Sequence, residues 1–381
     1  MLWGHANPEN PMNFDFSDDQ KFLQQTARDY LAEHSPLSAC REILETEKPY
    51  ADDLWKGAAE MGWQGAVIPE EYGGAGFGHL ELAMIAEEVG RALAPIPFAS
   101  SVYFATEALL QAGSDEQKKK YLPSLASGSF IGTFALTEKA GQNDVENVQA
   151  RVANGKISGT KFPVIDGDIA NFAVVAAQGA KGLSLYLVDL EGEGVQRESV
   201  TSFDPSRSMA RIEFDGAAAE LLGEDGNGAA LASHLLDRAA ALMAFEQLGT
   251  AQACFDITKE FTLGRYAFGR PVASFQSIKH RLADMWCEIE LARSNAYYGA
   301  WALSNEEKEL DVAACVARIQ ASEALEQVSV EMIQMHGGVG YTWEYDCHLF
   351  YRRAKLLGAI LGGPAQWKNK LVDRIQDQGA G

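Results

Sequence analysis

Apolar side chains recur every three or four positions between Phe22 and Leu31, which is the spacing of an amphipathic helix. Ser17, which precedes two aspartates, is expected to cap this helix at its amino end. The same spacing covers three further segments, residues 54–61, 80–93 and 100–112. The chain therefore begins with an all-helical region. Residues 1–13, with two prolines and three asparagines, are expected to form a loose arm ahead of it.

The periodicity changes after residue 129. Residues 148–152 alternate between apolar and polar, and Asn154-Gly155 is a dipeptide that favours a two-residue hairpin turn. Short β-prone runs follow at residues 172–177, 183–190 and 211–214. This pattern predicts a small β-domain.

From Gly228 the long helical pattern returns, and short links favour a bundle. The expected helices cover residues 229–263, 273–303, 307–336 and 343–357. We therefore expect an α+β chain of three domains. They are an all-α domain at 14–128, a β-domain at 129–226 and a four-helix bundle at 227–377.

Composition narrows the possible partners and the cellular setting. The 381 residues carry a formal net charge of −21, which argues against nucleic acid and anionic membranes as partners. No apolar run is long enough to cross a bilayer, and the amino end lacks the features of a signal peptide. The five cysteines are scattered and form no C-x-x-C pair, and the histidines lack metal-ligand spacing. These features predict a cytoplasmic protein with reduced thiols and no metal.

The segment Arg265–Met285 combines several residue types that suit a nucleotide ligand. Arg265 offers a permanent planar cation for phosphate oxygens, and Phe268 and Gln276 add an aromatic face and an amide. Gly269 and Pro271 predict a tight turn between two helices. Spacing alone favours a simple helical hairpin with a surface arginine.

The order R-x-x-F-G-x-P, followed by F-Q-x-x-x-H-x-L-A-D-M, resembles the acyl-CoA dehydrogenase family. The resemblance spans about residues 14–375 and implies the helix–sheet–helix order predicted above, with FAD as cofactor. It also implies that Arg265, Phe268 and Gln276 reach the FAD of the neighbouring subunit.

Two further stretches carry the resemblance. Residues 134–144 are similar to the A-L-T-E-P-x-A-G-S-D signature, which makes Leu136 and Thr137 contacts of the flavin ring. Asn143 stands where the family usually has serine, at a position that can bind phosphate. In Lys161–Gly167, similar to K-x-W-I-T-N-G, the family's aromatic and hydroxyl residues are replaced by Pro163 and Ile165.

The segment Gln334–Gly340 resembles the Q-x-x-G-G-x-G motif. Paired glycines let the backbone approach a ligand closely and present N–H groups to a pyrophosphate. The resemblance implies that Gln334, Gly337 and Gly338 contact FAD. A helix C-cap explains the same glycines, and the two roles are compatible.

The family's reaction needs a carboxylate that takes a proton from the carbon next to the thioester. Most members carry it in an E-G-T turn, where this chain has Leu361 or Gly362. A minority carry it at the position of Ala239. Glu246, two turns further along the same helix face, is the remaining candidate base. The alternative is a buried glutamate paired with an arginine.

The resemblance implies an FAD-dependent acyl-CoA dehydrogenase, or one subunit of such an enzyme. It is closest to a bacterial branch that acts on bulky acyl-CoA substrates such as steroid side chains or dicarboxylic acids. Electron-transfer flavoprotein is the expected electron acceptor, and a homo- or hetero-oligomer is the expected assembly. Two alternatives stay open. One is a non-catalytic subunit that completes the FAD site of a base-bearing sister chain. The other is a flavin oxidase or monooxygenase.

Overall fold

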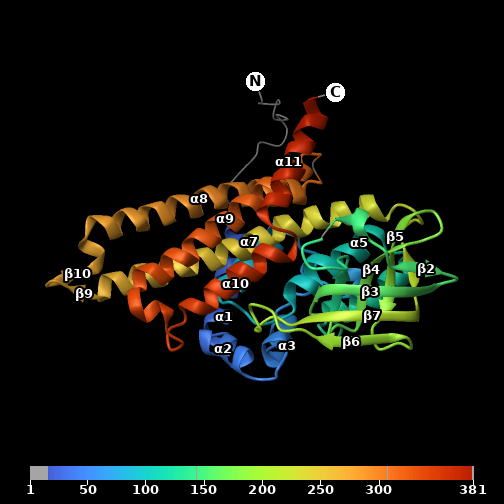
Figure 1. Ribbon diagram of the computed structural model, residues 1–381, viewed down its shortest axis with the longest axis horizontal. Helices are drawn as coiled ribbons and strands as arrows, with labels where there is room; N and C mark the ends of the chain where they lie inside the picture. The colour runs from blue at the N-terminus through green and yellow to red at the C-terminus, as the bar shows by residue number, and fades with distance from the viewer. Residues whose placement is uncertain (1–15, 143, 307, 380–381) are drawn as a thin grey trace.

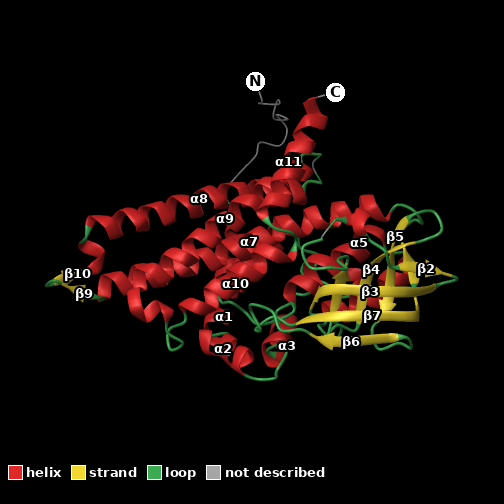
Figure 2. Ribbon diagram, in the orientation of Figure 1, coloured by secondary structure: helices red, strands yellow, loops and turns green. Residues whose placement is uncertain are grey.

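The computed structural model describes residues 16–142, 144–306 and 308–379. The expected amino-terminal arm and Asn143 therefore lie outside the described residues. The described chain forms helices, then a sheet, then long helices, as predicted, and the sheet occupies one end of the molecule (Figures 1 and 2). In this view the long helices reach from the sheet to the opposite end.

The amino-terminal region is helical throughout. Ser17 and Gln20 cap its first helix reciprocally, with Gln20 N donating to Ser17 Oγ at 3.2 Å and Ser17 N to Gln20 Oε1 at 3.0 Å. The segments are α1 (Asp18–His34), α2 (Leu37–Glu45), α3 (Asp52–Glu60), η1 (Glu70–Tyr72), α4 (His79–Arg91), a fully buried π-helix η2 (Ala99–Thr106), α5 (Glu107–Ala112) and α6 (Asp115–Ala126).

The sheet has the order β6-β7-β3-β2-β4-β5-β8, and β1 pairs in parallel with β4. The predicted hairpin at Asn154-Gly155 joins β2 to β3, and both turn residues have a positive φ. The strands are β1 (Gly132–Ala135), β2 (Arg151–Ala153), β3 (Lys156–Ile165), β4 (Phe172–Gln178), β5 (Leu183–Asp189), β6 (Val195–Ser199), β7 (Met209–Ala218) and β8 (Glu220–Leu222).

The carboxy-terminal region contains the four expected helices and one more. They are α7 (Gly228–Gly264), α8 (Gln276–Ser304), α9 (Leu310–His336), α10 (Cys347–Ile360) and α11 (Pro364–Gly379). The pattern did not predict α11, because its sequence is mostly polar. The central helix α7 has 37 residues, and its middle is buried on all sides.

Helices α4 and α7 cross at two glycines. A Cβ atom on Gly90 would overlap the carbonyl oxygen of Glu246, and one on Gly249 would overlap that of Glu87. The two backbones therefore touch, and only glycine fits at either position. This crossing fixes the amino-terminal helices against the bundle. Within the described residues, no helix has both the length and the apolarity needed to span a bilayer.

Candidate functional site

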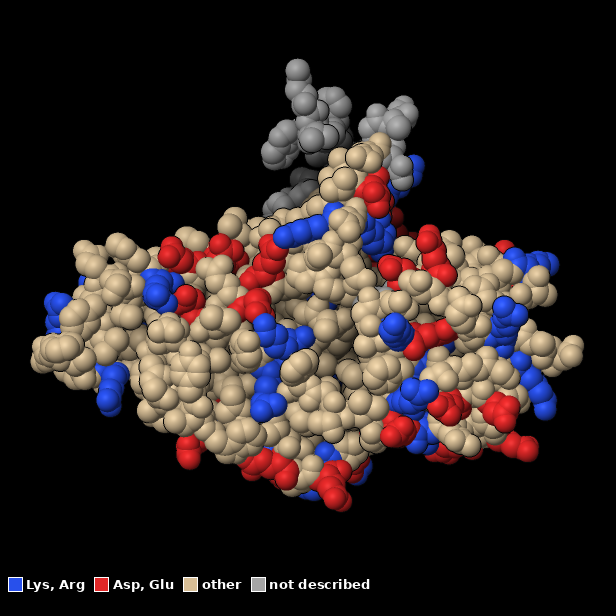
Figure 3. Space-filling model, viewed as in Figure 1, with Lys and Arg blue, Asp and Glu red and all other residues tan. Residues whose placement is uncertain are grey.

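A pocket of about 750 Å³ lies where the sheet meets the bundle, and Figure 3 shows the surface hollowed between these two parts. Its walls come from the sheet, from one face of α9 and from the end of α10. The lining residues are Phe104, Phe134, Leu136, Thr137, Ala140, Gly141, Pro163, Ile165, Met209, Leu236, Ser322, Glu323, Glu326, Gln327, Val330, Glu331, Ala354, Lys355, Leu356, Gly358, Ala359, Ile360, Leu361, Gly363, Pro364 and Gln366.

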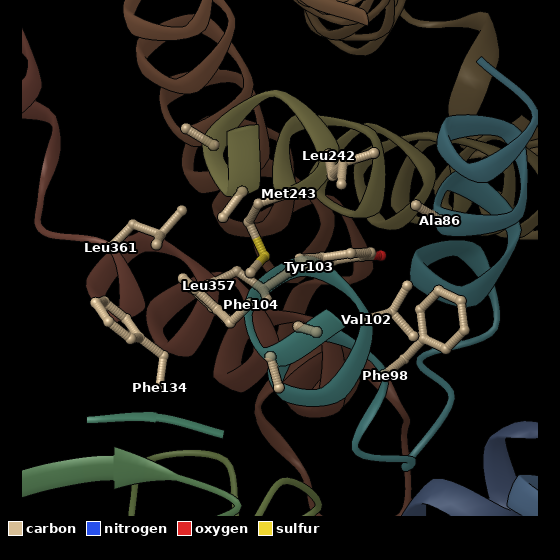
Figure 4. Close-up of a cluster of buried hydrophobic side chains, with 14 of the residues drawn as sticks. Ala86, Phe98, Val102, Tyr103, Phe104, Phe134, Leu242, Met243, Leu357 and Leu361 are labelled. Carbon is tan, nitrogen blue, oxygen red and sulfur yellow. The ribbon is translucent and has the colours of Figure 1, made fainter. Parts of the chain in front are cut away.

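Aromatic rings close the inner end of the pocket. The rings of Phe104 and Phe134 stack with their centroids 5.8 Å apart. Figure 4 shows Leu361 near Phe134, and Met243 and Tyr103 on the other side of Phe104. The inner end is therefore apolar, as a flat aromatic ligand requires.

The structure places Leu136 and Thr137 in this pocket. They follow β1 directly, and the amide N of Phe162 donates to the carbonyl of Thr137 at 2.8 Å. That bond brings Pro163 and Ile165 of β3 to the same pocket wall. The two stretches identified in the sequence therefore form one continuous wall.

Arg265, Phe268 and Gln276 lie on a different surface, and none of them lines the pocket. The chain after α7 forms a small hairpin of β9 (Tyr266–Ala267) and β10 (Arg270–Pro271) at the tip far from the sheet (Figure 1). Phe268, in the turn of this hairpin, has a φ of 53° and is 96% exposed. We call this hairpin the tip.

Gln334, Gly337 and Gly338 are also exposed, at the carboxy-terminal end of α9. Phe261 of α7 stacks on His336 with ring centroids 4.1 Å apart, which joins this end of α9 to the helix that leads into the tip. Gly337 has a φ of 64°, and no atom lies within 4 Å of a Cβ built on either glycine. A ligand can therefore approach this backbone closely.

These two surfaces suit the two halves of an FAD molecule. The pocket has the volume and the apolar inner end that the flavin ring requires, and the exposed set offers an arginine, two amides and open glycine backbone for a pyrophosphate. None of the exposed set lines the pocket, so the two groups of residues belong to separate surfaces of this chain.

The pocket also contains carboxylates that the sequence analysis did not identify. Glu323, Glu326 and Glu331 line it from α9, and each forms an ion pair. Their partners are Lys368, Lys355 and Arg281, respectively. Spacing of three and eight residues places them on one helix face, but nothing in the sequence indicates which face meets the sheet.

Glu246 does not line the pocket; it lies in the interior and is fully buried. Arg207 Nη1 is 3.1 Å from Glu246 Oε1, and Arg353 Nη1 is 4.0 Å from the same atom. Burial and the nearby Glu246 carboxylate raise the pKa of Tyr103 well above its ordinary value. This arrangement is that of a buried, charge-paired glutamate.

The ion pair of Glu246 belongs to a network that joins all parts of the chain. Ser100 in η2 donates to Asp166 at 2.6 Å, and burial raises the pKa of this aspartate although Arg207 acts against it. Arg353 in α10 donates to Asp204, between β6 and β7, at 2.6 Å. Since every part is buried, we interpret the network as a connection between helices and sheet.

A second pocket of about 390 Å³ adjoins the first and shares three lining residues with it. Asp144, Glu146 and Asp373 line it, and Lys370 is the one basic residue among the described residues of its lining. Lys370 already binds Asp237 at 2.8 Å. This neighbouring surface is therefore acidic and does not favour a polyanionic group such as CoA.

No group of histidine, cysteine, aspartate and glutamate among the described residues could hold a metal ion.

Comparison with known proteins gives consistent matches. The family model for the acyl-CoA dehydrogenase N-terminal domain matches residues 17–129, and the model for the C-terminal domain matches residues 226–375. Acyl-CoA dehydrogenase IpdE2 of Mycobacterium tuberculosis is 31% identical over 359 residues, covering 94% of this chain and 98% of that protein.

Two solved structures are similar over nearly the whole chain. A chain of the Tcur3481–Tcur3483 steroid ACAD is 30% identical with a TM-score of 0.88, covering 96% of this chain and 99% of that one. A chain of the ChsE4–ChsE5 complex from Mycobacterium tuberculosis is 26% identical with a TM-score of 0.88, and the same shares are covered.

Proposed function

Because this chain belongs to the acyl-CoA dehydrogenase family, we propose that it is one subunit of an FAD-dependent acyl-CoA dehydrogenase and that a sister chain supplies the catalytic base. The proposal rests on the residue that lines the pocket where the catalytic base is expected. Leu361 lines it where the family's glutamate is expected, and Gly362 follows with a φ of 89°. An apolar side chain cannot accept the proton.

The carboxylates that are present do not replace this base. Glu246 is fully buried against arginine and has no access to the pocket. The three pocket glutamates are held in ion pairs on the α9 wall. A general base needs a free carboxylate within reach of the substrate carbon.

The cofactor assignment rests on residues of both surfaces. Leu136 and Thr137 would hold the flavin ring, and Arg265, Phe268, Gln276, Gln334, Gly337 and Gly338 would hold the rest of an FAD bound by the neighbouring chain. When bound, FAD would accept the hydride from the substrate. Electron-transfer flavoprotein is then the expected acceptor of the electrons.

The CoA part of the substrate is expected to avoid the second pocket of this chain, because that pocket is acidic and its lysine is paired. Two of the similar solved structures bear the names of two different chains, and one is described as a steroid enzyme. These similarities support an assembly of two different chains. They are also the reason to include steroid-derived acyl-CoA esters among the substrates tested.

The decisive experiment expresses the chain alone and together with a sister chain that retains the E-G-T glutamate. The flavin spectrum is recorded anaerobically while short-chain, dicarboxylic and steroid-derived acyl-CoA esters are added. We expect bleaching only in the co-expressed complex, and loss of bleaching when the sister chain's glutamate is changed to glutamine. Bleaching in the chain alone contradicts the proposal and supports a self-sufficient dehydrogenase. A flavin that no ester bleaches in either preparation supports an oxidase or monooxygenase.

A further inference from the structure

Beyond the residues that line the pocket, a buried lysine contacts the segment that carries Leu136 and Thr137. Lys161 is completely buried in β3. Its Nζ donates to the carbonyl of Leu136 at 3.0 Å and lies 2.8 Å from Glu138 Oε1. A buried ammonium group is costly unless such partners surround it, so both contacts are needed.

Glu138 extends the same set of bonds to the next part of the chain. Its carboxylate accepts from the amide N of Gln149 at 2.9 Å and from that of Ala150 at 2.8 Å. Charge-assisted bonds of this kind are stronger than neutral ones. The segment 136–138 is therefore held by β3 on one side and by residues 149–150 on the other.

Residues 136 and 137 lie beyond the end of β1, outside the sheet, where the chain lines the pocket. β1 ends at Ala135, so the ladder with β4 no longer holds Leu136 or Thr137. One backbone bond, from Phe162 N to the carbonyl of Thr137, continues the attachment at 2.8 Å. Neither Lys161 nor Glu138 lines the pocket.

We infer that Lys161 and Glu138 are positioning residues that fix Leu136 and Thr137 against the flavin ring. They act through the backbone of the pocket wall and touch no ligand. The inference rests on the proposed function, since it concerns how this chain holds FAD.

The test uses the complex purified with its sister chain and three variants of this chain. Lys161→Met removes both contacts of the lysine, and Glu138→Gln removes the charge from its partner with almost no change in shape. Lys156→Met is the matched control, because Lys156 is an exposed lysine on the same strand. FAD affinity is measured by fluorescence quenching, the environment of the ring by visible circular dichroism, and the backbone by hydrogen exchange without FAD.

We expect Lys161→Met and Glu138→Gln to weaken FAD binding by roughly tenfold or more and to change the visible circular dichroism of the flavin. Exchange at the amides of Gln149 and Ala150 should become about tenfold faster in both variants, and Lys156→Met should match the wild type. A purely structural role would lower thermal stability and leave the flavin signal unchanged.

If folded Lys161→Met binds FAD with wild-type affinity and shows the wild-type visible circular dichroism, the inference is overturned. If Lys161→Met does not fold, the same two measurements on Glu138→Gln decide it. If wild-type protein binds no FAD, the proposed function fails, and the exchange measurement separately decides whether Lys161 and Glu138 hold the segment. If hydrogen exchange at the amides of Gln149 and Ala150 is then unchanged in the variants, Lys161 and Glu138 do not hold the segment.

Discussion

Arg207 Nη1 lies 3.1 Å from Glu246 Oε1 in the interior, where both side chains are almost completely excluded from solvent. Breaking such a pair leaves one charge buried without compensation. The role of Glu246 can therefore be decided by its effect on stability as well as on activity.

We predict that Glu246→Gln lowers the free energy of unfolding by about 3–5 kcal/mol, because Arg207 loses its nearer carboxylate and keeps only the more distant Asp166 at 3.9 Å. Urea unfolding measures this change. Glu213→Gln is the control, since Glu213 forms an exposed pair with Arg211 at 2.9 Å and should change stability by less than about 1 kcal/mol. A stable Glu246→Gln protein with no activity would instead identify Glu246 as the base.

The crossing of α4 and α7 gives a second prediction. Gly249→Ala should destabilise the fold by about 1–3 kcal/mol or more, because its methyl group has no room beside Glu87. Gly264→Ala is the comparison at the end of the same helix, where no atom lies within 4 Å of the added carbon, and it should change stability little. Thermal unfolding of both variants measures the difference, and equal melting temperatures would refute the close crossing.

A third prediction concerns pH. Burial lowers the pKa of Lys161 from 10.5 to about 8, with Glu138 acting against this shift. The folded protein thus releases this proton near pH 8, and the unfolded chain keeps it until about pH 10.4. Because the unfolded state binds more protons in this range, Lys161 makes stability rise as the pH increases from 8 to 10.5.

The difference in unfolding free energy between wild type and Lys161→Met isolates this effect, since all other groups titrate in both proteins. We expect the difference to shift in favour of the wild type across that range, by on the order of 3 kcal/mol. A difference that is constant with pH would show that the lysine has an ordinary pKa in the folded protein.

A fourth prediction concerns the tip. Phe268 is 96% exposed and makes little contribution to the fold of one chain, so Phe268→Ala should leave the melting temperature of the isolated chain unchanged. If the tip contacts the FAD of a neighbour, the same variant should lose flavin from the assembled protein. Flavin content and assembly mass are measured together, with Phe22→Ala, 74% exposed on α1, as the control. Full flavin retention in Phe268→Ala contradicts the role of the tip.

Local patterns in the sequence were sufficient for the order of helical and β regions and for several of their elements. Asn154-Gly155 specified a hairpin through its own backbone preference, and Ser17 specified a helix start through its own side chain. Leu136 and Thr137, which one short motif singles out, line the pocket. Each of these features depends on residues close together in the chain.

The pairing of distant groups was not predictable in the same way. Arg207 lies 39 residues before Glu246, in the loop between two strands, and nothing local indicates that they meet. The spacing of the glutamates of α9 predicts that they share one helix face. Which part of the chain that face meets depends on the packing of the whole bundle. Helix α11 was not predicted, because most of its residues are polar and its apolar positions are few.

Helix α7 has 37 residues, and its length sets how far the tip lies from the sheet. At about 1.5 Å per residue it spans roughly 55 Å, from the end next to the sheet to the tip. Deleting a single residue from its middle would shorten it only slightly, yet it would turn the tip by about 100° about the helix axis. Arg265 and Phe268 would then face another direction. The distance and angle between the pocket and the tip of one chain are thus set by the number of residues in one helix.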